Sequence, residues 1–253
     1  MSPDAPILAT SDDALLGGRV RLRQPREGYR VAIDPVLLAA AVPAAADDRV
    51  LDIGCGVGAA SLCLAARVAG CRVTGLERDR ALAELARDNA AHNDVADRLA
   101  VIAGDLLRRP ASLIPGSFTA VMANPPYLEA AKASPSPLAA KAAASVESAA
   151  ALADWIDFAL AMLRDKGGLT LIHRADRLGD ILAALAGRAG GIIVFPLWPG
   201  EGKPAKRILV QAQKGSAAPL TLAAGLVLHR ADGRNTEAAE AILRHGAPLP
   251  LVP

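Results

Sequence analysis

Asn124, Pro125, Pro126 and Tyr127 form a tetrapeptide whose residue types could hold an amino group. It follows a short apolar run, 118–123, that predicts a buried strand, and its Asn-Pro and Pro-Pro steps favour a rigid turn at the strand's carboxyl end. Since proline lacks an N–H and fixes φ, the Asn124 side-chain oxygen and a proline carbonyl can accept both hydrogens of one planar NH₂ group. Tyr127 can stack on the ring that carries the amine. The tetrapeptide therefore predicts a pocket for an aromatic or amide NH₂ group.

A glycine-rich loop lies upstream of this turn. Gly54, Gly56 and Gly58 stand at alternate positions, after an apolar run at 49–53 and before a helix-prone segment. Glycine lets the backbone turn tightly and come close to a ligand. The segment also fits the dinucleotide pattern GxGxx(G/A), which is a weak signal on its own. A dehydrogenase would use this loop but would leave the Asn-Pro-Pro-Tyr turn without a role.

Three acidic residues stand at the ends of predicted strands. Glu77 comes about 20 residues after the loop, where a carboxylate can bind two ribose hydroxyls. Asp105 can accept a hydrogen bond from an adenine amine, and Asp52 can brace the glycine loop or meet an ammonium group. Ligands of open α/β sheets bind at the carboxyl ends of the strands. These residues predict a crevice for an adenosyl compound beside the amine-accepting turn.

The elements that must position these residues alternate between strand and helix from residue 49 onwards. Strands are expected at 49–53, 72–77, 99–103, 118–123, 168–173, 191–196 and 206–212. Helices are expected at 58–69, 79–91, 150–163 and 176–188. This alternation predicts an α/β fold with a doubly wound, seven-stranded, mostly parallel sheet and helices on both faces. We expect three segments: a basic hairpin-and-helix extension (1–48), the main domain (49–215) and a tail packed on it (216–253).

Composition narrows the class of protein. The net charge of +2 is too small to indicate a nucleic-acid binder by itself. No apolar stretch reaches the roughly 18 residues that span a bilayer, and the first 18 residues lack a basic signal-peptide start, so we expect a cytoplasmic protein. Cys55, Cys63 and Cys71 are odd in number and lack CxxC spacing, which predicts buried free thiols and no metal site.

The loop from Asp52 to Gly58, with Glu77, Asp105 and the Asn-Pro-Pro-Tyr turn, resembles the class I S-adenosylmethionine-dependent methyltransferases that modify planar nitrogen atoms. More closely, the chain is similar to the bacterial tRNA (adenine-N6)-methyltransferases that act on valine tRNA. That similarity extends to residues 23–38, 203–215 and 226–243, although Asn235 stands where an aromatic residue is expected. The resemblance implies a Rossmann-like methyltransferase fold, S-adenosylmethionine as the methyl donor and tRNA as the partner.

The resemblance also implies roles for individual residues. The catalytic turn would be Asn124 to Tyr127, with the target NH₂ between the Asn124 side-chain oxygen and the Pro125 carbonyl; no histidine base is required. The cofactor would be bound by Asp52, Gly54, Gly56, Gly58, Glu77, Arg78, Asp105, Leu106 and Asn124. RNA would be contacted by basic residues in two clusters: Arg19, Arg21, Arg23 and Arg30, and Lys203, Lys206 and Arg207. The loop 129–148 could close over a flipped base.

Other functions remain open. Methylation of a release-factor glutamine uses the same Asn-Pro-Pro-Tyr motif, but those enzymes carry a longer helical domain before the glycine loop. Methylation of guanine N2 in ribosomal RNA is a further alternative, although those enzymes tend to have Phe after the second proline. DNA adenine methylation usually brings a large insertion that is not visible here. An inactive RNA-binding module would be expected to lose Asn124, Glu77 or a loop glycine, and none is lost.

Overall fold

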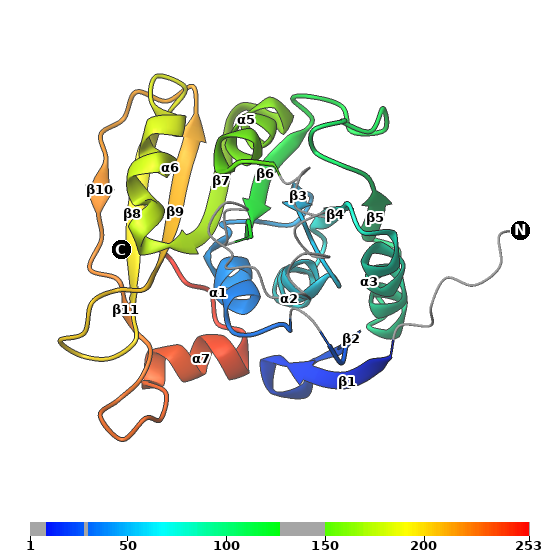
Figure 1. Ribbon diagram of the computed structural model, residues 1–253, viewed down its shortest axis with the longest axis horizontal. Coiled ribbons are helices and arrows are strands. Elements are labelled where there is room, and N and C mark those ends of the chain that lie inside the picture. The colour runs from blue at the N-terminus through cyan, green and yellow to red at the C-terminus, as the bar shows by residue number, and fades with distance from the viewer. Residues whose placement is uncertain (1–8, 28–29, 127–149, 253) are drawn as a thin grey trace, which may run out of the picture.

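The computed structural model describes residues 9–27, 30–126 and 150–252. Within these ranges a nine-stranded sheet forms the centre of the molecule, in the order β10-β8-β9-β7-β6-β3-β4-β5, with β11 also paired to β8 (Figure 1). Its strands are β3 (Arg49–Ile53), β4 (Arg72–Glu77), β5 (Leu99–Ala103), β6 (Phe118–Ala123), β7 (Leu163–Arg174), β8 (Ala189–Trp198), β9 (Arg207–Lys214), β10 (Thr221–Leu222) and β11 (Leu226–Val227). Only β9 runs antiparallel to its neighbours, β7 and β8, among the described strands of this sheet.

The helices of the described ranges precede, connect or follow these strands. They are α1 (Asp34–Ala41), α2 (Ala59–Arg67), α3 (Arg80–His92), α5 (Leu152–Met162), α6 (Leu178–Leu185) and α7 (Glu237–His245), with short 3₁₀ turns η1 (Leu16–Gly18) and η3 (Ala175–Arg177). The mostly parallel α/β fold is confirmed. The seven predicted strands are all present, and β10 and β11 add two residues each at the β8 side, too short to leave a periodic pattern.

Alternation along each strand divides the core into two layers. Val50 on β3 belongs to the same buried cluster as Leu62 and Leu64 of α2, whereas Leu51 and Ile53 belong to a second cluster that includes Ile156 of α5. Helices α1 and α2 therefore cover one face of the sheet, and α5 and α6 cover the other. Since Asp52 lies between Leu51 and Ile53, its side chain points towards the α2 face.

An antiparallel hairpin precedes the main alternation. It pairs β1 (Thr10–Leu15) with β2 (Val20–Pro25). Val20 and Leu22 are buried while Arg21 is exposed and Arg23 half-buried, so the predicted alternation of arginine and apolar residues is confirmed. The hairpin and α7 lie side by side along the lower edge of Figure 1, where α7 contacts η1.

The C-terminal segment contacts α1 as well. The Leu249 N–H donates to the Ala40 carbonyl at 2.9 Å, and one Arg19 guanidinium nitrogen donates to the His245 carbonyl at 2.8 Å. The division of the chain into the three segments 1–48, 49–215 and 216–253 stays a prediction. No helix among the described residues is long and apolar enough to cross a membrane.

Candidate active site

The sheet brings four strand ends together, as the sequence predicts. Strands β6, β3, β4 and β5 are adjacent and parallel. Ile53 pairs with both Ala123 and Leu76, and Glu77 pairs with Ala103. The residues that follow these strands therefore share one edge of the sheet.

The glycine loop between β3 and α2 has a backbone that other residues could adopt only with strain. Gly54, Gly56 and Gly58 have φ of 69°, 56° and 85°, which lie in the region that favours glycine. The Gly54 and Cys55 N–H groups donate to the Leu76 carbonyl at 2.7 and 3.1 Å, which anchors the loop to β4. A Cβ built at Gly56 would meet no atom of the described residues within 4 Å. The loop thus has an open side where its backbone can meet a ligand.

Trp155 on α5 covers the other part of this loop. A Cβ built at Gly54 would fall well inside van der Waals contact of Trp155 Cη2 and lie 2.8 Å from its Cζ3. The indole therefore fits against Gly54 only because that residue has no side chain. The scarcity of aromatic residues marks Trp155 in the sequence, but nothing local indicates this contact 101 positions away.

Glu77 is already oriented by the loop. Its Oε2 accepts a hydrogen bond from the Gly56 N–H at 2.8 Å, and its Oε1 accepts one from the Asp79 N–H at 2.8 Å. Each carboxylate oxygen has a second acceptor position. The carboxylate of the half-buried Glu77 can therefore still accept hydrogen bonds from two hydroxyl groups. The two backbone N–H groups hold the carboxylate plane in place.

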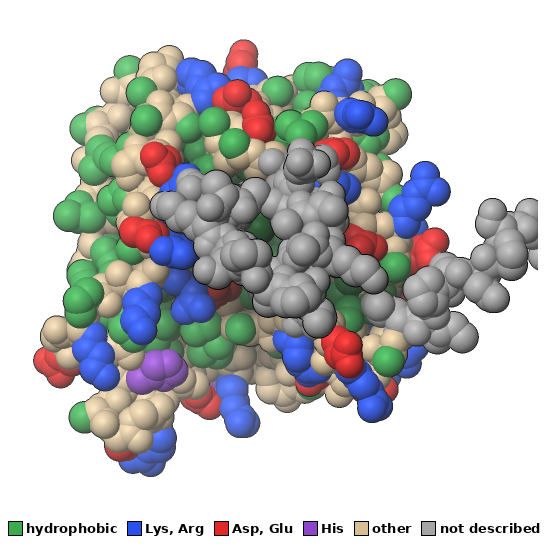
Figure 2. All heavy atoms as spheres, in the orientation of Figure 1, with side chains coloured by type: hydrophobic (Ala, Val, Ile, Leu, Met, Phe, Trp, Pro, Cys, Tyr) green, Lys and Arg blue, Asp and Glu red, His purple; other side chains and the backbone are tan. Residues whose placement is uncertain are grey.

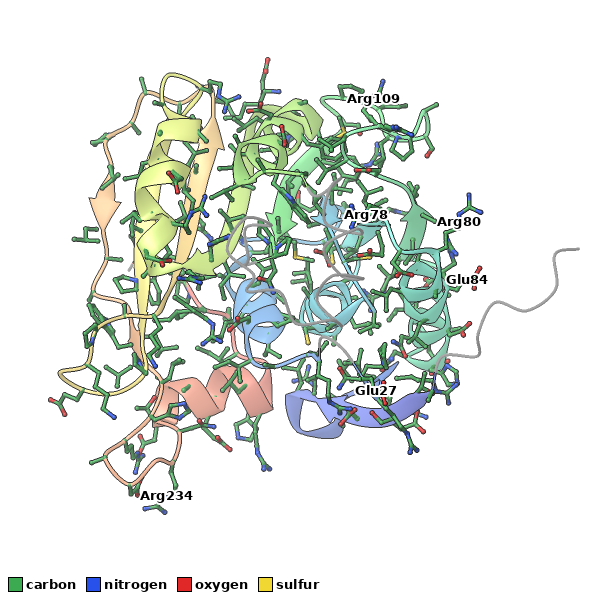
Figure 3. The ribbon with its side chains drawn as sticks, viewed as in Figure 1. Glu27, Arg78, Arg80, Glu84, Arg109 and Arg234 are labelled. Atoms are coloured by element: carbon green, nitrogen blue, oxygen red, sulfur yellow. The ribbon has the colours of Figure 1, made fainter. Side chains whose placement is uncertain are left out.

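Asp105 and its neighbours stand next to Glu77 along the edge. Asp105 Oδ1 accepts a hydrogen bond from the Leu107 N–H at 3.0 Å, and both Asp105 and Leu106 are half-buried. Figure 3 places Arg78 at the end of β4, while Arg80 and Glu84 of α3 point outwards. The carboxylate of Asp105 keeps acceptor positions for a ligand amine.

Asp52 is a buried residue, only 2% exposed. Its Oδ2 accepts a hydrogen bond from the Ser61 hydroxyl of α2 at 2.6 Å. Burial, with a smaller contribution from the negative charge of Glu77, raises the pKa of Asp52 to about 7, although the Ser61 bond acts in the opposite direction. Of the two roles predicted for Asp52, the structure favours bracing the loop, because β3 and α2 are linked through it on both sides of the glycines.

This raised pKa gives a testable pH dependence. The folded state binds the Asp52 proton more tightly than the unfolded state, so the protonated carboxyl stabilises the protein at low pH and that stability is lost as pH rises from about 4 to about 7. Asp52→Asn keeps an acceptor for Ser61 but cannot ionise. We expect the melting temperature of the wild type to fall relative to that of Asp52→Asn between pH 5 and pH 8. Parallel melting profiles across this range would refute the assigned shift.

The Asn-Pro-Pro turn follows β6 directly. Asn124 is half-buried, Pro125 is buried and Pro126 is exposed. The Asn124 side chain makes no hydrogen bond within the described parts of the chain. Tyr127 and the predicted loop 129–148 lie outside the described residues.

Most of the hairpin arginines that the sequence predicts as RNA contacts form hydrogen bonds or ion pairs within the protein. Arg23 Nε is 3.1 Å from Asp12 Oδ1, and an Arg30 guanidinium nitrogen is 2.9 Å from Asp13 Oδ2. Arg19 donates to backbone carbonyls of His245 and Ala66. Of the four predicted hairpin contacts, only the Arg21 side chain makes no hydrogen bond or ion pair within the described ranges. Exposed ion pairs of this kind are weak, so the pairs to Asp12 and Asp13 can open.

The second basic cluster lies at the start of β9. Arg207 Nε is 2.8 Å from Oδ2 of Asp34, a residue with a 4% exposed side chain at the start of α1. This pair ties α1 to β9, whereas Lys203 and Lys206 are exposed. Lys203 also lines an open hollow of about 590 Å³ beside Trp198. Figure 2 shows several Lys and Arg side chains on the lower left part of the face in view.

Cys55, Cys63 and Cys71 are all free and buried, as predicted. Burial raises the pKa of the Cys63 thiol to about 12 and that of Cys55 well above its usual range. Both thiols therefore remain protonated at neutral pH and pack as small apolar groups. No group of His, Cys, Asp or Glu that could hold a metal ion is found in the described part of the chain.

Comparison with known proteins places this site in context. A family model described as "Methyltransferase small domain" matches residues 30–177, more than half of the chain. A solved structure of a predicted O-methyltransferase from Agrobacterium tumefaciens superposes with a TM-score of 0.70 and 30% identity, covering 85% of this chain and 98% of that one. A tRNA methyltransferase from Aquifex aeolicus, 14% identical with a TM-score of 0.54, shares the fold over 76% of this chain and 72% of its own.

Curated relatives carry a more specific name. A protein from Porphyromonas gingivalis named tRNA1(Val) (adenine(37)-N6)-methyltransferase is 35% identical over 158 residues, which are 60% of this chain and 61% of that relative's length. A protein of the same name from Dickeya chrysanthemi is 29% identical over 226 residues, covering 87% of this chain and 88% of that one. The similarity to the second relative extends to nearly the whole length of both chains.

Proposed function

From the premise that the chain belongs to the methyltransferase small-domain family, we propose that it transfers a methyl group from S-adenosylmethionine to the exocyclic N6 amine of an adenine in tRNA. The observation that carries the proposal is the convergence of the glycine loop, Glu77, Asp105 and Asn124 on adjacent strand ends. The shared name of the bacterial relatives supports the choice of adenine and tRNA.

The residues of the crevice fit S-adenosylmethionine. The open side of Gly56 admits an adenosyl group close to the backbone, and the carboxylate of Glu77 faces it with two unused acceptor positions. Asp105 lies one strand further along and would accept the adenine amine. When bound, this cofactor supplies an electrophilic methyl group on a sulfonium. The proposed lining also includes Gly54, Gly58, Arg78 and Leu106. Asp52 lies behind the loop and stabilises it through its hydrogen bond with Ser61.

The turn after β6 would activate the target amine. An aromatic NH₂ is a poor nucleophile because its lone pair is delocalised into the ring. Asn124 Oδ1 and the Pro125 carbonyl would each accept one of its hydrogens, which favours a pyramidal nitrogen and stabilises the positive charge that develops on it. Methyl transfer would leave the nitrogen positively charged, and the nitrogen would then lose a proton to solvent. Tyr127 is proposed to stack on the flipped base.

This chemistry separates the proposal from oxygen methylation, the activity in the name of the Agrobacterium protein. A hydroxyl acceptor offers one hydrogen, whereas the two oxygens of the turn suit a group with two. We therefore take an NH₂ group as the acceptor.

The exposed lysines give a prediction on RNA binding. Lys203→Ala and Lys206→Ala should each weaken tRNA binding and reduce the slope of log affinity against log salt by about 1, the effect of one lost phosphate contact. Arg72→Ala, an equal charge loss at the amino end of β4 and hence at the opposite edge of the sheet, should leave the slope unchanged. Filter binding across a salt series measures both. Equal slopes for all three variants would show that these two lysines do not contact the RNA.

The substrate class is tested by offering S-adenosylmethionine with a labelled methyl group together with unmodified bulk tRNA, ribosomal RNA or a release factor. We expect label in the tRNA fraction alone. Label in the release factor would instead indicate glutamine methylation, which the same turn could support through an amide NH₂. Label in none of them, with cofactor binding intact, would favour an inactive RNA-binding module.

A further inference from the structure

Asn89 of α3 and Asn93, which caps the carboxyl end of that helix, pair with the basic hairpin as a neighbouring strand would. The Arg23 N–H donates to Asn89 Oδ1 at 2.8 Å, and Asn89 Nδ2 donates back to the Arg23 carbonyl at 2.8 Å. One helical turn later, Asn93 makes the same two bonds to the backbone of Arg21, at 2.8 and 2.7 Å. Alternate residues of β2 are thus held by side chains at i and i+4 of the helix.

Asn89 and Asn93 differ in the acceptor of their third side-chain bond. Asn93 Nδ2 donates to the Asn89 carbonyl of its own helix at 2.7 Å, whereas Asn89 contacts the glycine loop. Its Nδ2 also donates to the Val57 carbonyl in the glycine loop at 2.9 Å. Asn89 is 1% exposed, and its carboxamide uses both hydrogens and its oxygen. A single buried side chain therefore joins the hairpin to the loop, although Asn89 lies 66 positions from Arg23 and 32 from Val57.

The bond to Val57 gives the Val57–Gly58 peptide group an anchor outside the loop. The same peptide unit donates through the Gly58 N–H to the Cys55 carbonyl at 2.8 Å. With flanking glycines at positive φ, the backbone on either side restrains this peptide plane little, so the two hydrogen bonds fix its orientation from both ends. Ala86 lies one turn before Asn89, and a Cβ built at Gly58 would lie 3.4 Å from the Ala86 Cβ. The same face of α3 therefore packs on the loop.

We infer that Asn89 is a positioning residue that sets the Val57–Gly58 peptide for cofactor binding and couples it to the hairpin. This inference rests on the proposed use of the glycine loop for S-adenosylmethionine. Because coupling between two sites is reciprocal, cofactor binding should also make the β2 backbone more rigid through the same side chain.

The matched pair Asn89→Ser and Asn93→Ser tests the inference, since both lose the hairpin bonds and only the first loses the loop bond. Calorimetric titration with S-adenosylhomocysteine is expected to show about tenfold weaker binding for Asn89→Ser, in line with one lost hydrogen bond, and unchanged binding for Asn93→Ser. Hydrogen exchange gives the second readout. The cofactor product should slow exchange of the Arg23 amide in the wild type but not in Asn89→Ser.

Equal affinities in the two variants, or equal slowing of the Arg23 amide in the wild type and Asn89→Ser, would overturn the inference. If Asn89→Ser does not fold, the amide exchange of the wild type and of Asn93→Ser still decides, because both retain the Asn89 bonds and both should show the slowing. Failure of the wild type itself to bind S-adenosylhomocysteine would instead overturn the proposed function.

Discussion

Replacing Asn124 by alanine is expected to lower the rate of methyl transfer by about 100- to 1,000-fold, the cost typical of losing one preorganised group that stabilises developing charge. Asn124 is the first residue after β6, and its side-chain oxygen has no partner among the described residues. Alanine removes that acceptor and leaves the Pro125 carbonyl to hold one hydrogen of the amine alone. The measurement is single-turnover transfer of labelled methyl to tRNA.

The matched variant Asn124→Asp separates loss of the hydrogen-bond acceptor from loss of the side-chain volume. Aspartate keeps acceptor oxygens at the same place, so we expect it to retain more activity than alanine. Titration with S-adenosylhomocysteine should give affinities within about threefold of the wild type for both variants, because the ribose and adenine contacts are proposed elsewhere. A wild-type rate in Asn124→Ala would show that the turn does not hold the amine.

Replacing Gly54 by alanine is expected to weaken S-adenosylmethionine binding by at least about 100-fold and to lower the melting temperature. The new Cβ would collide with the Trp155 indole, and the residue would keep a φ of 69°. The indole must move, and overpacking of this kind costs about 1–3 kcal/mol in addition to about 1–2 kcal/mol for the left-handed backbone.

Gly116→Ala is the matched control for Gly54→Ala. Gly116 has a φ of 71°, and a Cβ there meets no atom of the described chain within 4 Å, so the variant measures the backbone cost alone. Adding Trp155→Ala to Gly54→Ala removes the collision and should recover part of the lost affinity, which a double-mutant cycle measures as coupling. Equal loss of stability in Gly54→Ala and Gly116→Ala would contradict the assigned contact.

The strands that carry the site could be predicted because their apolar runs end where glycine, acidic or amide residues begin. β3, β4, β5 and β6 have the predicted bounds, each being an apolar run that stops at a glycine, an acidic residue or Asn124. Helix α7 was not predicted, although Thr236 caps its start and Gly246 ends it in the left-handed region. Both residues are signals that the sequence contains.

The contacts between distant residues could not be predicted in the same way. Asn89 is a weak helix former within α3, and nothing nearby in the sequence indicates its bonds to Arg23 and Val57. The same holds for Ser61, the partner of Asp52. The number of basic residues in the sequence also did not indicate that Arg207 pairs with Asp34 while Lys206 stays exposed. That difference depends on which strand lies beside α1.

The central proposal, that the acceptor is the N6 amine of an adenine in tRNA, is tested most directly by identifying the methylated nucleoside. Unmodified tRNA is incubated with the protein and S-adenosylmethionine, digested to nucleosides and analysed by mass spectrometry against synthetic standards. We predict N6-methyladenosine, formed about 100- to 1,000-fold more slowly when Asn124→Ala is used in place of the wild type. Methylation of guanosine, or of adenosine at another atom, would contradict the account.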